Sequence, residues 1–261
     1  MVHNERRRPL DREKISVTII THNEEENIGD CLETVKWADE IVVVDSGSTD
    51  MTIEICKGYT DKVFFNSWVG MKEQKQYAVE KASNTWVFSI DADERATEGI
   101  KSFILQELKN PIYDGYRFPR QNYFLDKWLK HGGWYPDHVL RFFRKDRGYF
   151  GGVNPHDKVV VDGGSVTTVD IPFIHFTYKS IAQYLTKQNM YSSISATELF
   201  RAGRKIVPYI VPVKIMWKFI ETYFVKKGFL DGFRGFIVAM GATYSMFWKY
   251  IQLWELSRRD K

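Results

Sequence analysis

The acidic segment Asp91-Ala92-Asp93-Glu94 has the residue types and the spacing for metal chemistry. It follows the apolar residues 86–88, which predict a buried strand, so the carboxylates are expected where that strand ends. In an extended segment alternate residues share a face, so Asp91 and Asp93 would point the same way. Two such carboxylates favour Mg²⁺ or Mn²⁺, which can also hold substrate phosphates. The alternative is a solvated acidic turn that caps the next helix.

Two further polar loops follow predicted strands. Residues 15–20 are β-branched and lead into Thr21-His22-Asn23-Glu24, and residues 40–45 are apolar without alternation and lead into Ser46-Gly47-Ser48. Asn23 is expected to cap the next helix, with Glu26 completing a capping box. A carboxylate at a strand end, such as Asp45, can accept a hydrogen bond from a base imide or a ribose hydroxyl. Alternatively, Asp45 only caps the turn that follows it.

Two later loops are rich in glycine and other turn formers, and loops of this kind often carry positioned catalytic groups. Asp137 lies in the loop 132–138, and His156 and Asp157 lie in the loop 151–157. Asp137 and Asp157 are candidate general bases, and His156 is a candidate metal ligand or phosphate contact. Taken alone, each of them is more often a turn former or a surface group whose hydrogen bonds are satisfied.

The elements that must position these loops alternate between strand and helix over the first 110 residues. Repeated β-α units predict a parallel sheet with right-handed crossovers, and ligands of such sheets bind at the carboxyl ends of the strands. The three polar loops are therefore expected to converge at one edge of the sheet. No G-x-G-x-x-G follows the first strand, which argues against a dinucleotide-binding dehydrogenase.

The composition is that of one large globular domain, or of one domain with an appendage: 261 residues, of which 44% are hydrophobic. A net charge of +4 is too small to predict a nucleic-acid partner. The two cysteines, Cys31 and Cys56, fall in predicted helices and are expected to be reduced thiols of a cytosolic protein. Residues 1–13 are expected to be a disordered basic leader, and no apolar stretch reaches the length of a membrane span.

The last third of the chain, residues 179–261, is predicted to be helical and is rich in aromatic residues and lysines. Aromatic, lysine-flanked helices that are too short to span a bilayer are typical of proteins that lie on an anionic membrane face. The alternative is that these aromatic side chains pack under the catalytic domain or form a contact between copies of the chain.

In combination, these motifs resemble those of family 2 glycosyltransferases with the GT-A fold. The resemblance rests on T-x-N-E from Thr21, V-V-D-S-G-S-T-D from Val43 and D-A-D-E from Asp91, followed by W-Y-P-D with L-R-F-F-R from Trp134 and the His-Asp loop. More narrowly, the chain is similar to the bacterial lipopolysaccharide-core β-1,4-glucosyltransferase type. The resemblance implies an α/β GT-A catalytic domain over residues 14–178, with a mostly parallel central sheet flanked by helices, and a helical extension over 179–261.

The resemblance also implies roles for particular residues. Asp45 would bind the uracil, Asp91 the ribose or the metal-held diphosphate, and Asp93 would be the principal ligand of Mg²⁺ or Mn²⁺. A carboxylate on the opposite face would take the proton of the acceptor hydroxyl, and Asp137 is preferred over Asp157 for this role because its segment resembles the family's base motif. The expected donor-binding set is Thr21, Asn23, Glu24, Asp45, Ser46, Gly47, Lys72, Gln76, Asp91 and Arg141, and the expected metal set is Asp93, Asp91 and His156.

The function implied is inverting, metal-dependent transfer of a hexose, with glucose expected, from a UDP-sugar to a lipopolysaccharide inner-core saccharide. The same donor chemistry on a polyprenyl phosphate or a protein is an alternative, as is a non-catalytic binder of nucleotide sugars. The expected partners are the donor, a lipid-linked saccharide acceptor and an anionic membrane surface, without nucleic acid; a homo-oligomer is left open. The expected location is cytoplasmic, peripheral to the inner face of the membrane.

Overall fold

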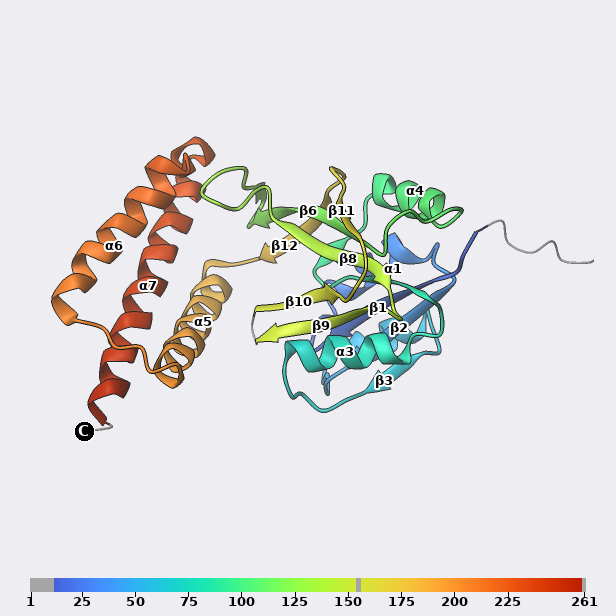
Figure 1. Cartoon of the computed structure of the whole chain (residues 1–261), viewed down its shortest axis with the longest axis horizontal. Coiled ribbons are helices and arrows are strands. Elements are labelled where there is room, and N and C mark those ends of the chain that lie inside the picture. Colours follow the sequence, from blue (N-terminus) through green and yellow to red (C-terminus); the bar gives the residue numbers. More distant parts are fainter. Residues whose placement is uncertain (1–11, 154–155, 260–261) are drawn as a thin grey trace, which may run out of the picture. The chain divides into compact units, whose positions relative to one another are not determined.

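The structure is a computed structural model that describes residues 12–153 and 156–259 (Figure 1). The predicted leader at residues 1–13 therefore lies almost wholly outside the described residues. The chain forms two compact units. The first contains the described residues up to Phe118 together with His138–Phe173, and the second contains Pro119–Asp137 together with the described residues from Ile174 onward.

The first unit is built on a sheet whose parallel strands run in the order β3-β2-β1-β4. Strand β8 lies next to β4 and runs antiparallel to it, and β6 follows. Strands β1 and β2 are almost wholly buried, as expected for parallel strands covered on both faces. These strands are β1 (Ile15–Thr21), β2 (Glu40–Asp45), β3 (Val63–Phe65), β4 (Trp86–Ser89), β6 (Gly115–Phe124) and β8 (His138–Arg144).

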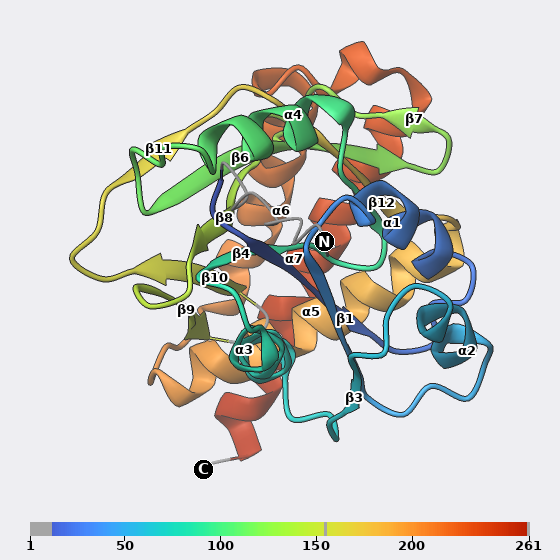
Figure 2. The same cartoon turned by 90° about the vertical axis from the view of Figure 1, so that its right-hand side faces the viewer.

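Helices cover both faces of this sheet (Figure 2). On one face, α1 (Ile28–Val35), α2 (Thr52–Lys57) and α4 (Glu98–Glu107) bury their apolar side chains against the strands in the main core. On the other face, α3 (Met71–Lys81) packs beside an antiparallel hairpin. The hairpin consists of β9 (Gly148–Val153) and β10 (His156–Val161).

Four short strands complete the sheet, and they are β5 (Glu94–Arg95), β7 (Lys127–Trp128), β11 (Val166–Thr168) and β12 (Phe173–Tyr178). Strand β7 forms a small hairpin with the end of β6, and β11 runs parallel to the start of β6. Strands β6 and β12 both begin in the first unit and continue into the second.

The second unit is mainly helical, and its longest helix, α7, packs against both α5 and α6 (Figure 1). Its core joins Phe124 and Leu129 to Tyr178, Tyr184 and Val238. A Cβ atom on Gly241 would lie only 1.9 Å from the Tyr184 hydroxyl oxygen, so glycine is required where Tyr184 packs on α7. The elements are α5 (Ile181–Arg201), η1 (Pro208–Ile210), α6 (Val211–Ile220), η2 (Glu221–Val225), η3 (Gly228–Asp231) and α7 (Phe233–Arg259).

Among the described residues, no helix has both the length and the apolar character needed to cross a membrane.

The predicted helix cap at Asn23 is wrong. Helix α1 begins at Ile28, and its N-cap is Asn27, whose side chain makes no capping hydrogen bond. Asn23 has a positive φ of 52°, a conformation that asparagine tolerates better than most residues. Its side chain instead accepts a hydrogen bond from the backbone N–H of Thr49 at 2.8 Å, and so joins two loops. The capping-box spacing was present, but the side-chain oxygen of Asn23 bonds Thr49, which is remote in the sequence, instead of a helix N–H.

Candidate active site

The carboxyl ends of β1, β2 and β4 bring the three polar loops to one edge of the sheet, which confirms the predicted convergence. Thr21 pairs directly with Asp45 in the register of β1 and β2, and the Ser46 N–H donates to the Thr21 carbonyl at 3.1 Å. On the other side of β1, the Ile90 N–H donates to the Thr18 carbonyl at 3.0 Å. The loops that follow these strands are therefore neighbours, although they are far apart in the sequence.

Asp45 is buried at the end of β2, and its carboxylate shapes the loop that follows. One oxygen accepts the backbone N–H groups of Gly47 at 2.7 Å and Ser48 at 2.8 Å, and the other accepts the Ser48 hydroxyl. Gly47 has a φ of +100°, which glycine adopts without strain. The structure thus shows the turn-forming role of Asp45, and recognition of the nucleotide base by this residue stays a prediction.

The loop after β1 is held to the loop after β2 by hydrogen bonds between them. The Asn23 N–H donates to the Ser48 hydroxyl at 2.8 Å, and the Glu24 N–H donates to the Thr52 hydroxyl at 2.8 Å. The hydroxyl of Thr21 is buried and has no hydrogen-bond partner among the described residues. These contacts preorganise the region in which donor binding is predicted for Thr21, Asn23, Glu24, Ser46 and Gly47.

The acidic segment after β4 is a tight turn, so the expectation of an extended segment is wrong. The Glu94 N–H donates to the Asp91 carbonyl at 2.9 Å, and the Asp91 N–H donates to the Glu94 carboxylate at 2.9 Å. The Cys31 thiol lies beneath the turn and reaches the Asp91 carbonyl at 3.5 Å. Because the turn is closed by these bonds, the roles of Asp91 and Asp93 must be judged from their contacts and not from strand alternation.

Asp91 lies between two buried cations. Arg141 donates from one guanidinium nitrogen to the Asp91 carboxylate and to the Glu94 carboxylate, each at 2.7 Å. The Lys75 ammonium donates to the Asp91 carboxylate at 3.1 Å and also lies 3.3 Å from the carboxylate of Asp157. We call these five residues, Asp91, Glu94, Arg141, Lys75 and Asp157, the charged network.

Burial opposes ionisation in this network, and the paired charges overcome it. Burial alone would raise the pKa of Asp91, but the charges of Arg141 and Lys75 hold that pKa well below its ordinary value. Burial likewise disfavours the charged form of Arg141, yet Asp91 and Glu94 raise its pKa above the ordinary value. Asp91 therefore stays ionised and Arg141 stays protonated throughout the physiological pH range.

The turn can offer carboxylate oxygens to a divalent cation. Asp93 is partly exposed at the corner of the turn, and the buried Asp91 oxygen that accepts no hydrogen bond among the described residues lies 3.1 Å from the Lys75 ammonium. Those residues bring no three Asp, Glu, His or Cys side chains together as a metal cage. Mg²⁺ commonly uses only one or two protein carboxylates and takes its other ligands from substrate phosphates and water. The donor set therefore fits a cation that binds together with a diphosphate.

Several predicted site residues are placed with other contacts. Lys72 is ion-paired with its neighbour Glu73 at 3.1 Å, and Gln76 accepts the Phe150 N–H at 2.9 Å, which fastens α3 to β9. Asp137 belongs to the second unit, where Arg120 donates to its carboxylate at 2.8 Å. The side chain of His156 lies outside the described residues. The roles predicted for these four residues stay predictions.

Lys75 and Glu94 were missing from the predicted site set, and both are central to the charged network. Glu94 is fully buried, and Lys75 is 6% exposed. A signal for Lys75 was present, because it stands three and four residues before Ala78 and Val79, on the buried face of α3. Lys72 lacked that signal, because the residues three and four positions after it are polar, and its side chain is about one-third exposed. Glu94 gave no local signal, because its partner Arg141 is remote in sequence.

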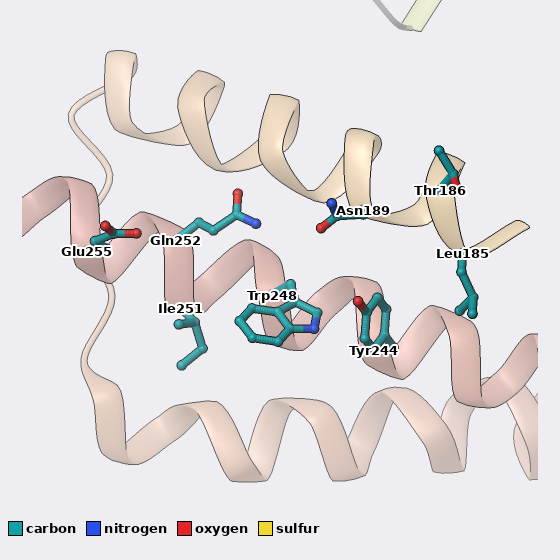
Figure 3. Close-up of a pocket in the computed structure, with 8 residues that line it drawn as sticks. All are labelled: Leu185, Thr186, Asn189, Tyr244, Trp248, Ile251, Gln252 and Glu255. Atoms are coloured by element: carbon teal, nitrogen blue, oxygen red, sulfur yellow. The ribbon is translucent and has the colours of Figure 1, made fainter. Parts of the chain in front are cut away.

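The second unit carries a groove with a volume of about 620 Å³ along α5 and α7 (Figure 3). Trp248 and Tyr244 present aromatic rings, and Asn189, Gln252 and Glu255 present amide and carboxylate groups. The mixture of flat aromatic rings with hydrogen-bonding groups suits a ligand that has both apolar faces and hydroxyls. The remaining lining residues are Leu185, Thr186 and Ile251.

Comparison with known proteins agrees with this architecture. Residues 16–166 match the model of the family described as glycosyl transferase family 2. An uncharacterized glycosyltransferase of Rickettsia typhi is 30% identical over 95% of this chain and 89% of its own length. The lipopolysaccharide core biosynthesis glycosyltransferase LpsC of Rhizobium meliloti is 30% identical, with 88% of each chain covered.

Among solved structures, the mannosyltransferase PcManGT from Pyrobaculum calidifontis, in complex with GDP-Man and Mn²⁺, superposes with a TM-score of 0.52. The match covers 96% of this chain and 88% of that one at 15% sequence identity, so it speaks to the fold alone. The GT-A fold and the glycosyltransferase assignment expected from the sequence are confirmed. The chain belongs to glycosyl transferase family 2.

Proposed function

We propose that the chain is an inverting hexosyltransferase that moves glucose from UDP-glucose to a lipid-linked saccharide of the lipopolysaccharide inner core. It would act in the cytoplasm at the inner face of the membrane. The observation that carries the proposal is the charged network around the Asp91–Glu94 turn, at the carboxyl end of β4 and beside the loops of β1 and β2. Ligands of such sheets bind at this edge.

The charge of the network supports a divalent cation at Asp93. Three carboxylates, those of Asp91, Glu94 and Asp157, face two cations, Lys75 and Arg141. A donor diphosphate would be repelled by this surplus unless a cation bound with it. Mg²⁺ or Mn²⁺ held by Asp93 beside Asp91 would supply Lewis-acid stabilisation of the leaving diphosphate. Lys75 and Arg141 hold the turn in place for this contact.

Asp137 is the proposed general base. In an inverting displacement the base lies across the anomeric carbon from the leaving group, where it takes the proton of the attacking hydroxyl. Asp157 is joined through Lys75 to Asp91, so it belongs with the groups on the donor side. That placement favours Asp137, which Arg120 orients through its carboxylate.

The proposed acceptor is a saccharide for two reasons. The chain is similar over most of its length to LpsC, which is named for lipopolysaccharide core biosynthesis. The groove on α5 and α7 supplies aromatic rings that can stack on sugar faces, together with amide and carboxylate groups that can bind hydroxyls (Figure 3).

A donor screen tests the proposal. The thermal stability of the full chain would be measured with UDP-, GDP- and dTDP-glucose, each with and without Mn²⁺, followed by release of the nucleoside diphosphate in the presence of a core saccharide. We expect stabilisation by UDP-glucose that requires the cation. Asp93→Asn should lower turnover by about 10²-fold or more, because it removes a ligand whose charge serves the transition state.

Asp146→Asn is the matched control, because Asp146 is exposed and bonds only its neighbour Arg144 among the described contacts. It should retain wild-type turnover. Full, cation-dependent activity of Asp93→Asn would overturn the role of Asp93. Transfer to polyprenyl phosphate in place of the saccharide would overturn the proposed acceptor.

A further inference from the structure

An apolar surface in the second unit is left uncovered by the residues that the structure describes. Six large side chains on α6, η2, η3 and the start of α7 are each between 45% and 74% exposed. Soluble proteins seldom expose so many large apolar groups together. We call this surface the apolar face, and it comprises Met216, Trp217, Phe224, Phe229, Leu230 and Phe233.

Ring contacts make the apolar face continuous. The ring centroid of Tyr223 lies 5.1 Å from that of Phe224 and 6.3 Å from that of Phe229. The ring centroid of Phe236 lies 5.9 Å from that of Tyr223 and 6.1 Å from that of Phe233. Trp217 lies on α6, which continues directly into the π-helical η2 that carries Phe224. The exposed rings of Phe224, Phe229 and Phe233 are thus connected through Tyr223 and Phe236.

The backbone under the apolar face is anchored. Asp231 is 4% exposed, and its carboxylate accepts the backbone N–H groups of Lys130 at 3.1 Å and His131 at 2.8 Å. A Cβ atom on Gly235 would lie 1.8 Å from the Gly228 carbonyl oxygen, so the start of α7 is pressed against η3. Because these contacts fix the segment, its aromatic side chains cannot turn inward without breaking them.

Basic residues flank the apolar face along the sequence, and one of them, Arg234, is ion-paired with Asp126. Residues 203–250 contain eight Lys and Arg against two Asp and Glu, a surplus larger than the net charge of +4 of the whole chain. Both acidic residues are engaged: Asp231 is buried, and Glu221 lies 3.1 Å from Lys218 and 2.6 Å from Lys226. Lys226 and Lys227 are exposed directly before η3.

We propose that the apolar face docks the chain on an anionic lipid bilayer, with its aromatic side chains in the interface and Lys226 and Lys227 on lipid headgroups. Amphipathic aromatic surfaces flanked by lysines bind anionic bilayers in this way. A second copy of the chain fits less well, because a twofold contact would set the same lysines against each other. The docking rests on the proposed function in that it would bring the chain to a lipid-linked acceptor, but it can be measured without donor or acceptor.

Vesicle flotation of the full chain tests the docking. Phosphatidylglycerol-containing vesicles should carry the wild-type chain, and pure phosphatidylcholine vesicles should carry it much less. The double substitution Trp217→Ser with Phe233→Ser should weaken partition into anionic vesicles at least tenfold, because two aromatic side chains that would be buried in the bilayer interface are lost. Lys226→Gln with Lys227→Gln should weaken it roughly tenfold and remove most of its dependence on salt.

Ile112→Ser is the control, because Ile112 is an equally exposed apolar side chain, at 71%, in the first unit. It should float like the wild type, and circular dichroism should show all variants folded. Wild type that fails to float with anionic vesicles, or an aromatic double variant that floats unchanged, would overturn the docking. A wild-type dimer that the same double variant dissociates, without vesicle binding, would also overturn it.

Turnover on a delipidated saccharide separates this inference from the proposed function. Variants that lose vesicle binding but keep this turnover support the docking surface. A wild-type chain that floats on anionic vesicles but transfers no sugar would support the docking surface and overturn the proposed function.

Discussion

Lys75 reaches two carboxylates that lie on different elements. Its ammonium contacts Asp91 after β4 and lies 3.3 Å from Asp157 on β10, and its stem is buried in α3. A buried cation shared by two carboxylates is strongly held, and loss of one partner would leave an uncompensated charge. The two aspartates of the D-x-D segment therefore differ: Asp91 is occupied with Lys75 and Arg141, and Asp93 lies at the corner of the turn.

The two candidate bases have different contacts, Asp137 with Arg120 and Asp157 with Lys75, and this gives separate expectations for them. Asp137→Asn should lower kcat by about 10²–10⁴-fold while donor binding by thermal shift is retained, since the base acts on the acceptor hydroxyl. Asp157→Asn should mainly weaken donor binding, because it disturbs Lys75 beside Asp91. Initial rates over a range of donor concentrations distinguish these effects. A larger loss of kcat in Asp157→Asn than in Asp137→Asn would reverse the assignment.

At the scale of single residues, the sequence indicated where the candidate site residues stand, but not which contacts they make. The spacing of Asp91 and Asp93 and the position of Asp45 at a strand end could be read directly. The buried pairing of Arg141 with Glu94 could not, because it joins residues 47 positions apart across two strands. Turn geometry at Asp91 also escaped prediction, since the bond from the Asp91 N–H to the Glu94 side chain replaces strand pairing.

Among the elements, the amino ends of the strands are joined by Glu40 at the start of β2. Its carboxylate accepts bonds from the Ser16 hydroxyl on β1, the Ser83 N–H before β4 at 2.7 Å, and the Lys62 ammonium before β3. Burial alone would raise the pKa of Glu40, but these bonds lower it to about 2. Glu40 thus fastens the edge of the sheet opposite the candidate active site.

Glu40→Gln should lower the free energy of unfolding at pH 7 by about 1–2 kcal/mol, because buried donors lose a charged acceptor. The folded pKa of about 2 lies below the ordinary 4.5, so the stabilisation is complete above about pH 4.5 and is lost as the pH falls toward 2. Denaturant unfolding over this pH range should show a shallower slope in the variant than in the wild type. Glu98→Gln is the control, because that side chain is 84% exposed. Equal pH slopes in wild type and Glu40→Gln would contradict this role.

The elements themselves were largely predictable. Residues 40–45 were expected as a strand, and β2 has those bounds, because a β-branched run bounded by turn formers leaves little choice. The position of β8 between β4 and β6 was not predictable. That order depends on pairing between segments about fifty residues apart, for which the local pattern contains no information.

For the whole molecule, the two units carry different parts of the proposed reaction. The first unit holds the charged network and the proposed donor loops, and the second holds the groove on α5 and α7 and the apolar face. The sequence indicated the change in character after residue 110. The sequence could not tell which aromatic residues are packed in the core and which are exposed, because helical spacing alone does not show which face of α6 or α7 is covered.

This division predicts that a substitution in the groove weakens binding of the acceptor and leaves binding of the donor unchanged. Trp248→Ala should raise the KM for the saccharide by up to about tenfold, in line with the loss of an aromatic contact, and leave the KM for the donor unchanged. Trp254→Ala on the same helix is the control, because Trp254 does not line the groove. Initial rates with each substrate varied in turn provide the check. An unchanged acceptor KM in Trp248→Ala would remove the groove from acceptor binding.

The Cys31 thiol under the acidic turn has a consequence of another kind. It is fully buried, its pKa is raised by that burial, and its sulfur touches the Asp91 carbonyl. A reagent can reach it only after local opening has exposed the thiol to water. The rate at which Cys31 is alkylated therefore depends on how often this part of the structure opens. Alkylation of Cys31 can therefore report how often the region around the candidate active site opens.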